Sequence, residues 1–558
     1  MPKIRSCLIV ASALLFLFAG VSNAQRSAID TYAITNARIV TVSGPVIDRG
    51  TVVIRNGLIA AAGANVTAPP DARVIDGTGL TVYPGLIDSY TNLALPEAAP
   101  SPSPGGGGGG FFFVQQQQPR PAAGPNSTQP PGLQPEVMVE DVIRPGGNEI
   151  ESSRNVGITT ALTLPRSGVW IGQSALINLA GETSQQMIVR SPVAMHVGFT
   201  PLRTGGYPGS LLGVFSALRQ MMLDAQRYRD SLAIYEREPR GTRRTETDRS
   251  LAALIPVVEG RMPVVMLANS EREITRALDL GAEFKLKLII AGGREADRVT
   301  DRLVKQNVPV LLSLNLPKRT TAALPEADPE PLRVLRERVE AQQTAGKLAK
   351  AGVRFAFESG SITNISDLMG NVRTTIENGL QAVDAVRAFT IWPAQILGVQ
   401  DQLGSIEAGK IANLTVTRGD LFDRSSRVTH VFIDGRPVDI RSTPAGIGIG
   451  AGRGSLSGAW TVNVKLEGQG DYAITLTLRE EGERLSGSIS GPLGAGEISN
   501  ASVSNAGEVR FTASVNVEGQ TKEATFTGRY ASNEIRGSVA IVGSAPGTFT
   551  ATRSGLPN

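Results

Sequence analysis

The stretch PGLIDSYTNLAL, residues 84–95, has the pattern of a buried strand that ends in a loop: an apolar run, then polar side chains. Similar apolar runs recur along the chain as ITTALTL, SPVAMHV, PVVMLAN, LKLIIAG, VPVLLSL and VRFAFES. Helical patterns alternate with them at 211–237, 271–283, 294–306, 331–351 and 379–388. Strands that alternate with helices over about 300 residues predict an α/β fold, a (β/α)8 TIM-like barrel.

Short strand patterns flank this region on both sides. Residues 33–80 contain three alternating apolar runs, and Asn56-Gly57 between two of them is a strong β-hairpin signal. Residues 404–438 have the same character. From residue 455 onward, alternating strand patterns recur about every 12 residues between Gly, Asn and Ser turns. They predict a C-terminal antiparallel all-β domain, either a sandwich or a small barrel.

The N-terminus has the features of a secretory signal peptide. Lys3 and Arg5 precede an apolar run that is short for a membrane span, and the tripeptide SNA before Gln25 is a cleavage site. The single cysteine, Cys7, would leave with this segment, so we expect no disulfide in the mature chain. We therefore expect a periplasmic or secreted protein with no stable membrane span after cleavage.

No basic patch with interleaved aromatic residues is present, which argues against nucleic acid as a partner.

The flanking segments resemble the amidohydrolase superfamily, in particular members of the imidazolonepropionase and dihydroorotase type. The motifs that carry the resemblance are ITNARIVTVSG, VVIRNGLIAAAG, VIDGTGLTVYPGLID, IWPAQILGVQDQLGSIEAGKIANLTV and HVFIDGRPV. With the region between them, they cover about residues 33–440. The resemblance implies a small composite β-sandwich built from both ends of the domain and flanking a barrel. It also implies hydrolysis of non-peptide carbon–nitrogen bonds.

These observations predict the following organisation. The segments are a signal peptide (1–24), a composite β-sandwich (30–82 and 396–442), a TIM-like barrel (83–395), a Pro/Gly/Gln-rich insert (96–135), a Gly-rich linker (443–456) and a C-terminal β-sandwich or β-barrel (457–556). The insert is either a disordered segment with one docked apolar patch, FFFV, or a lid, because it follows the first barrel strand. Residues 167–182, SGVWIGQSALINLAGE, are interpreted as a structural loop whose Gly-Gln-Ser turn positions a strand.

Active members of the family hold zinc or a similar ion with side chains at the strand ends. The resemblance places the first histidine pair at Tyr90 and Asn92 and the strand-eight aspartate near Glu358. On strands five and six it gives apolar or amide residues, namely Leu267, Asn269 and Ala291.

Two counts that need no alignment agree with this. The chain has no lysine between Lys3 and Lys285, which excludes a carbamylated lysine as a bridging metal ligand on an early or middle strand. Its only histidines are His196 and His430, and His430 lies in a flanking strand. The sequence therefore predicts no metal site and no cofactor.

Five residues remain as candidates for the site. Glu358 ends an apolar strand, where burial would raise its pKa and suit it to acid–base catalysis; pairing with an arginine is the alternative. His196 lies in a middle strand, either as a core histidine or as a catalytic base. Tyr90, Asn92 and Asn269 either bind substrate or satisfy one another by hydrogen bonds.

Two functional hypotheses follow. In the first, the protein is an exported amidohydrolase-type hydrolase that is degenerate or acts without metal. In the second, it is a non-catalytic protein of the cell envelope that binds a small molecule or a peptide in the barrel mouth. A homo-oligomer, or pairing with a metal-competent relative, is compatible with either hypothesis.

Overall fold

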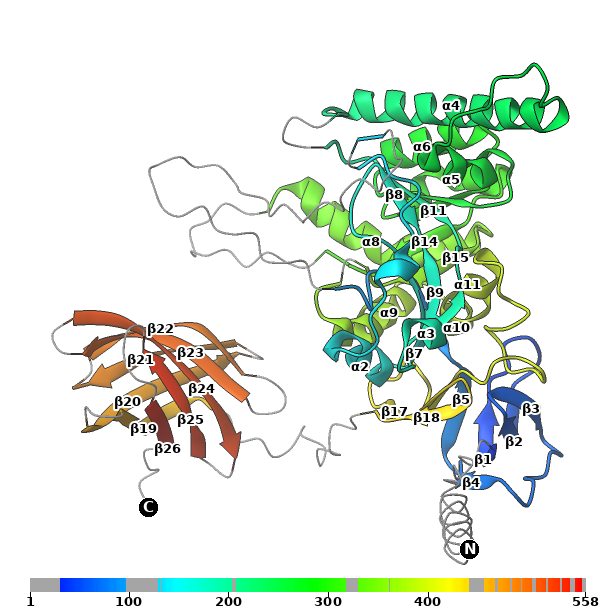
Figure 1. The fold of residues 1–558 in the computed structure, drawn as a ribbon. Helices are drawn as coiled ribbons and strands as arrows, with labels where there is room; N and C mark the ends of the chain where they lie inside the picture. Colours follow the sequence, from blue (N-terminus) through cyan, green and yellow to red (C-terminus); the bar gives the residue numbers. More distant parts are fainter. Residues whose placement is uncertain are drawn as a thin grey trace, which may run out of the picture. The chain divides into compact units, whose positions relative to one another are not determined.

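The computed structural model describes residues 31–96, 129–130, 132–202, 207–317, 330–360, 362–440 and, apart from short turns, 456–553. The chain divides into two compact units, Met1–Ser442 and Thr443–Asn558 (Figure 1). The predicted signal peptide, most of the predicted insert and nearly all of the predicted linker lie outside the described residues. No helix in the described ranges is both long and apolar enough to cross a membrane.

One eight-stranded sheet is built from both ends of the first unit. Its order is β18-β17-β16-β5-β1-β2-β3, with β4 beside β1. The strands are β1 Thr31–Ile39, β2 Ile47–Arg55, β3 Leu58–Gly63, β4 Arg73–Asp76, β5 Leu80–Pro84, β16 Leu414–Arg418, β17 Arg427–Ile433 and β18 Arg436–Val438. β5 pairs antiparallel with β16, so the blue and yellow strands of Figure 1 lie side by side. The predicted hairpin at Asn56-Gly57 joins β2 to β3, and both turn residues have positive φ, as a type I′ turn requires.

The TIM-like barrel is confirmed. Its parallel strands are β6 Leu86–Thr91, β7 Ile158–Thr163, β11 Met195–Gly198, β12 Val264–Ala268, β13 Leu288–Gly292, β14 Val310–Ser313 and β15 Phe355–Glu358. β6 pairs with β7, and β11 to β15 pair in sequence. The hydroxyl of Ser89 on β6 donates to the carbonyl of Phe357 on β15 at 2.6 Å, which joins the first strand to the last.

One wall of the barrel departs from the (β/α)8 pattern. β8 (Trp170–Gln173) and β9 (Ala175–Asn178) run antiparallel to β11 and β7 respectively. The expectation that 167–182 is a loop is therefore wrong, because this segment itself forms the wall between β7 and β11. Both strands are fully buried, and only six residues separate β7 from β8. Such a short connection suffices for an antiparallel return but not for a parallel crossover.

The helices pack around the barrel strands. They are α2 Asn148–Asn155, α3 Ser184–Met187, α4 Leu211–Arg237, α5 Arg249–Val258, α6 Glu271–Glu283, α7 Thr300–Lys305, α8 Leu332–Lys350, α9 Leu368–Glu377, α10 Ala382–Phe389 and α11 Ile391–Ile396. The predictions at 211–237 and 271–283 are confirmed by α4 and α6. Ser270 and Glu273 form a capping box that fixes the start of α6. The predictions at 294–306, 331–351 and 379–388 correspond to α7, α8 and α10, whereas α2, α3, α5, α9 and α11 were not predicted.

The interior of the barrel is an apolar cluster. It consists mainly of Ile87, Leu162, Leu176, Val265, Ile289, Ala291, Leu311 and Ala356, with Tyr90 and Leu267 packed against it. Because paired residues of parallel strands face the same side, His196, which pairs with Val265, points into this interior. By the same rule Ser313 and Glu358 form the polar end of the interior, at the C-terminal ends of β14 and β15.

The second unit is a closed barrel of eight antiparallel strands. They are β19 Gly458–Leu466, β20 Gly470–Glu481, β21 Arg484–Gly491, β22 Gly494–Val503, β23 Glu508–Val517, β24 Gln520–Ala531, β25 Glu534–Ile541 and β26 Gly547–Arg553. β19 pairs with both β20 and β26, which removes the free sheet edges. The structure confirms the antiparallel all-β prediction and selects the barrel over the sandwich.

Candidate functional site

Glu358 is a buried carboxyl at the polar end of the barrel interior. Its side chain is 3% exposed, and its Oε2 accepts a hydrogen bond from the backbone N–H of Gly360 at 2.6 Å. Burial raises the pKa of Glu358 to about 8; a hydrogen bond with Ser313 opposes the rise, and the charge of Asp88 adds to it. The carboxyl of Glu358 is therefore mostly protonated at neutral pH.

Asp88 is a second buried carboxyl at this site, and the sequence analysis missed it. Its Oδ1 accepts from the backbone N–H of Ser359 at 3.0 Å, and its Oδ2 accepts from the Ser359 hydroxyl. Burial raises the pKa of Asp88 to about 6, against these hydrogen bonds. The available signal was an acidic residue inside the apolar run PGLID, just before the strand end.

Tyr90 and His196 lie against each other inside the barrel. Their ring centroids are 5.6 Å apart. His196 is fully buried, neither of its ring nitrogens has a hydrogen-bond partner among the described residues, and burial lowers its pKa to about 3. Burial, with the charge of Glu358, raises the pKa of the Tyr90 hydroxyl. Both rings are therefore neutral at neutral pH.

The structure brings together three of the five candidate residues. A Cβ at Gly360 would lie 2.8 Å from the carbonyl oxygen of Tyr90 and 3.1 Å from Oε2 of Glu358, so these two residues flank one turn. His196 belongs to the same group because its ring lies against the ring of Tyr90.

The two asparagines hydrogen-bond or pack elsewhere, although Asn92 lies near this group. Asn92 is at the end of β6, where its Nδ2 donates to the carbonyl of Leu164 at 2.8 Å. Asn269 follows β12 and packs on Gly292, where a Cβ would lie 2.5 Å from its Oδ1. The structure gives no contact between Asn92 and Asn269, so they do not satisfy each other.

A cavity of about 330 Å³ opens where β6, β7 and β15 end. Most of its lining side chains carry a hydroxyl or an amide, and two carry a charge. The lining residues are Thr91, Asn92, Leu93, Asn148, Glu149, Ser152, Ser153, Arg166, Ser359, Gly360, Ile362, Thr363, Asn364 and Ile365. Asn269 is not among them. A cavity of this size with several hydrogen-bonding groups suits a small polar molecule.

The residues at the strand ends do not fit a catalytic metal ion. Leu267 on β12 and Ala291 on β13 are apolar, and His196 is enclosed by the core. Within the described ranges, no group of three or more His, Cys, Asp or Glu residues is placed to hold a metal. Zinc needs several nitrogen, sulfur or carboxylate donors, which this arrangement does not supply.

Comparisons with known proteins agree with the fold. The amidohydrolase family model matches residues 313–438. An amidohydrolase from Thermotoga maritima MSB8 is 25% identical, with a TM-score of 0.62, over 74% of this chain and 100% of that one. The first unit therefore has the fold of the amidohydrolase superfamily, and the family model matches its C-terminal part.

Two further similarities are weaker. Dihydropyrimidinase 1 of Caenorhabditis elegans is 40% identical over 63 residues, which is 11% of this amidohydrolase-type chain and 12% of that protein. The chain thus matches only about an eighth of that curated relative. A Xaa-Pro dipeptidase with bound methionine in its active site is 15% identical, with a TM-score of 0.44, over 73% of this chain and 100% of that one.

Proposed function

We propose that this amidohydrolase-type protein binds a small amide-bearing molecule at the mouth of its barrel and does not perform metal-assisted hydrolysis. One observation carries the proposal. The strand ends that the family uses for metal ligands present Tyr90, Leu267 and Ala291 instead, and these pack against the apolar interior. Since the superfamily acts on carbon–nitrogen bonds, the ligand class can be retained after the metal chemistry is lost.

The lining of the mouth cavity supports an amide as the ligand. An amide group offers a donor and an acceptor side by side, and the hydroxyls and amides around the cavity can serve either one. Arg166 and Glu149 add one charge of each sign at this cavity, so a ligand with an ionised end can also be oriented there.

A second candidate function is hydrolysis without a metal. The supporting observation is the pair of carboxyls whose surroundings separate their pKa values, to about 8 for Glu358 and about 6 for Asp88. Such a separation assigns an acid and a base within one site. Glu358 would supply a proton and Asp88 would accept one. Both carboxyls are buried behind the turn at Ser359 and Gly360, which favours the binding function.

Export and assembly are part of the proposal and rest on the sequence. Residues 1–24 support a cleaved signal peptide and a periplasmic or secreted location. N-terminal sequencing of protein purified from a periplasmic extract should then begin at Gln25. A protein that starts at Met1 would contradict export.

Pairing with a metal-competent relative would appear as a second chain in copurification from the native host, whereas a homo-oligomer would contain this chain alone.

One experiment tests the binding function. The mature protein is purified without added metal, its metal content is measured by elemental mass spectrometry, and a panel of N-acyl amino acids and cyclic amides is tested for hydrolysis and for thermal stabilisation. We expect no stoichiometric metal, no hydrolysis that EDTA inhibits, and stabilisation by at least one amide. Arg166→Ala should weaken that stabilisation, whereas the control Asn269→Ala, outside the cavity, should not.

The opposite result is equally clear. About one equivalent of zinc or manganese, together with hydrolysis that EDTA abolishes, would refute the proposal. Hydrolysis that resists EDTA and disappears in Glu358→Gln would instead select the second candidate function.

A further inference from the structure

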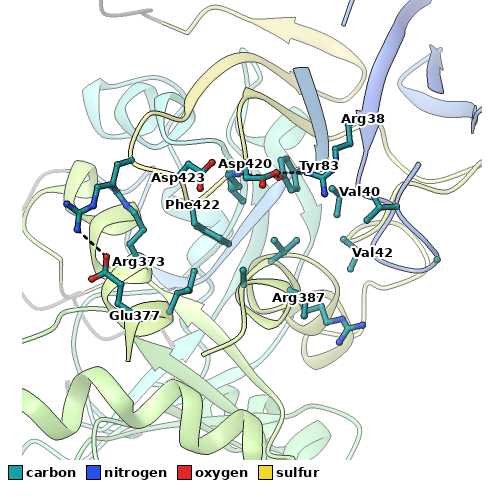
Figure 2. Close-up of a pocket in the computed structure, with 18 residues that line it drawn as sticks. Arg38, Val40, Val42, Tyr83, Arg373, Glu377, Arg387, Asp420, Phe422 and Asp423 are labelled. Atoms are coloured by element: carbon teal, nitrogen blue, oxygen red, sulfur yellow. Dashed lines mark hydrogen bonds and ion pairs between the residues drawn. The ribbon is translucent and has the colours of Figure 1, made fainter. Parts of the chain in front are cut away.

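A second cavity lies at the other end of the barrel from the mouth. It has a volume of about 510 Å³ and is bounded by β1 and the turn after it, by Tyr83 on β5, by α9 and α10, and by the segment after β16 (Figure 2). Tyr83 is on β5, before β6 begins, whereas Tyr90 is near the end of β6. The two cavities have no lining residue in common. The cavity is therefore separate from the mouth site.

One part of this cavity is an apolar surface. Val40, Val42 and Val46 come from the turn between β1 and β2, Val383 and Val386 from α10, and Phe422 from the segment after β16. Val46 and Val383 are 44% and 56% exposed although both are apolar. Figure 2 shows Val40, Val42 and Phe422 directed toward the same space. An apolar surface that the chain itself leaves open can take an apolar ligand.

The backbone conformation of Val42 is a second, independent observation that indicates a functional role for this surface. Its φ is +69°, a left-handed conformation that is unfavourable for a β-branched residue. Strained backbone of this kind is concentrated at ligand-binding and other functional positions, because it lowers stability unless something else selects for it. Here the conformation belongs to a residue that lines the cavity.

The wall behind the apolar surface is held in place before any ligand binds. The hydroxyl of Tyr83 accepts a hydrogen bond from the N–H of Leu421 at 3.2 Å and lies 3.5 Å from Oδ1 of Asp420. Asp420 is in turn paired with Arg38 at 2.5 Å. Because this wall is already ordered, ligand binding costs less conformational entropy.

Basic groups surround the cavity. Four arginines, Arg38, Arg373, Arg387 and Arg424, and three acids, Glu377, Asp420 and Asp423, line it. Arg38 and Arg424 pair with Asp420 and Glu377, and Arg387 pairs with Asp384. Arg373 donates its Nε to the carbonyl of Met369 at 3.1 Å and forms no ion pair within the described part of the chain. Its guanidinium is therefore available for an anion.

We propose that this cavity binds an amphipathic carboxylate of the fatty-acid type. Its apolar chain would lie against the valines and Phe422, and its carboxylate would pair with Arg373. This proposal concerns a different site from the mouth cavity, so it stands or falls independently of the function proposed there.

Decanoate and decanol, which share one chain and differ in charge, test the proposal by calorimetric titration of the full mature protein. We expect decanoate to bind more tightly than decanol. Arg373→Gln should weaken decanoate about tenfold, the loss expected for a hydrogen bond to a charged group, and leave decanol unchanged. Val383→Asp should weaken both probes.

Matched variants exclude general surface effects. Arg272, on α6, is exposed and lines neither cavity, so Arg272→Gln should leave decanoate affinity unchanged. Val339 on α8 is 55% exposed, almost the same as Val383 at 56%, which makes Val339→Asp the control for Val383→Asp.

Val42→Gly provides a third measurement. Glycine tolerates positive φ, so this variant should raise the melting temperature of the free protein while it weakens decanoate binding. Unchanged decanoate affinity in both Arg373→Gln and Val383→Asp would overturn the proposal. Absence of decanoate binding to the wild-type protein would do the same.

Discussion

Ser359 donates two hydrogen bonds to Asp88, one from its backbone N–H and one from its hydroxyl, and so ties the last barrel strand to the first. The same turn places the carboxyl of Glu358 on the N–H of Gly360. Two carboxyls thus share one buried turn, where burial raises the pKa of both and the charge of Asp88 further opposes the ionisation of Glu358. The consequences of this arrangement can be measured as the dependence of stability on pH.

The first prediction concerns Glu358 at neutral and alkaline pH. Its pKa is about 8 in the folded protein against an ordinary value of 4.5. The folded state therefore holds a proton that the unfolded state releases, so the contribution of Glu358 to stability is full below pH 4.5 and is lost as the pH rises through 8. Urea denaturation at pH 5 and pH 8 should show that Glu358→Gln removes much of this loss.

The control for this prediction is Glu182→Gln, at an exposed glutamate outside the turn. It should keep the wild-type difference between pH 5 and pH 8. If Glu358→Gln keeps that difference as well, the carboxyl of Glu358 is already ionised in the folded protein and the buried-acid account is wrong.

The second prediction concerns His196 at acidic pH. Burial lowers its pKa to about 3 from an ordinary value of 6.5. Its contribution to stability is therefore present above pH 6.5 and is lost as the pH falls toward 3. His196→Leu removes both the titrating group and two unpartnered ring nitrogens, so it should be less sensitive to acid than the wild-type protein.

Thermal melting between pH 7 and pH 4 would measure this effect. His430 is the matched control because it is the other histidine and is partly exposed on β17. His430→Gln should follow the wild-type profile more closely than His196→Leu does. A wild-type profile in His196→Leu would show that the ring of His196 is hydrated or paired in solution.

The sequence predicted those parts of the fold that depend on neighbouring residues. Periodicity placed the helices at 211–237 and 271–283 because an amphipathic pattern is local, and Asn56-Gly57 marked its hairpin for the same reason. The direction of β8 and β9 was missed. That direction depends on how far the chain must travel between neighbouring strands, which an apolar run by itself does not indicate.

The candidate site shows the same limit. Glu358 and His196 were named as candidates because of their places in apolar strands, and Tyr90 because the family resemblance puts it at a histidine position. Asp88 was missed because its partner, Ser359, lies 271 residues away in the sequence. No pattern around either residue indicates the other, and only the closure of the barrel brings them together.

The third prediction concerns the turn that joins the two carboxyls. A Cβ at Gly360 would lie 2.8 Å from the backbone oxygen of Tyr90, an atom that cannot move without displacing β6. Gly360→Ala should therefore lower the free energy of unfolding by about 1–3 kcal/mol, as overpacking does elsewhere. Gly370 on α9 has no atom within 4 Å of the corresponding position, so Gly370→Ala should be neutral or stabilising. Equal effects of the two substitutions in urea denaturation would contradict the close approach of Tyr90.

The fourth prediction concerns the C-terminal barrel as a separate folding unit. Its core is closed, and Trp460, the only tryptophan after residue 392, is fully buried within it. The indole Nε1 of Trp460 donates to the carbonyl of Leu456 at 2.9 Å, and Leu456 is itself fully buried. A fragment 453–558 should therefore unfold cooperatively, with Trp460 fluorescence as its probe. A fragment 458–558 lacks both the acceptor and the buried leucine, so it should be less stable by about 2–5 kcal/mol.

Leu456→Ala in the longer fragment separates the two contributions, because it keeps the backbone carbonyl and removes only the buried side chain. Its stability should fall between those of the two fragments. If the fragment 453–558 has the fluorescence of an exposed tryptophan and no cooperative transition, the barrel depends on the first unit for its fold. If the two fragments are equally stable, Leu456 does not belong to the core, and the unit begins at β19.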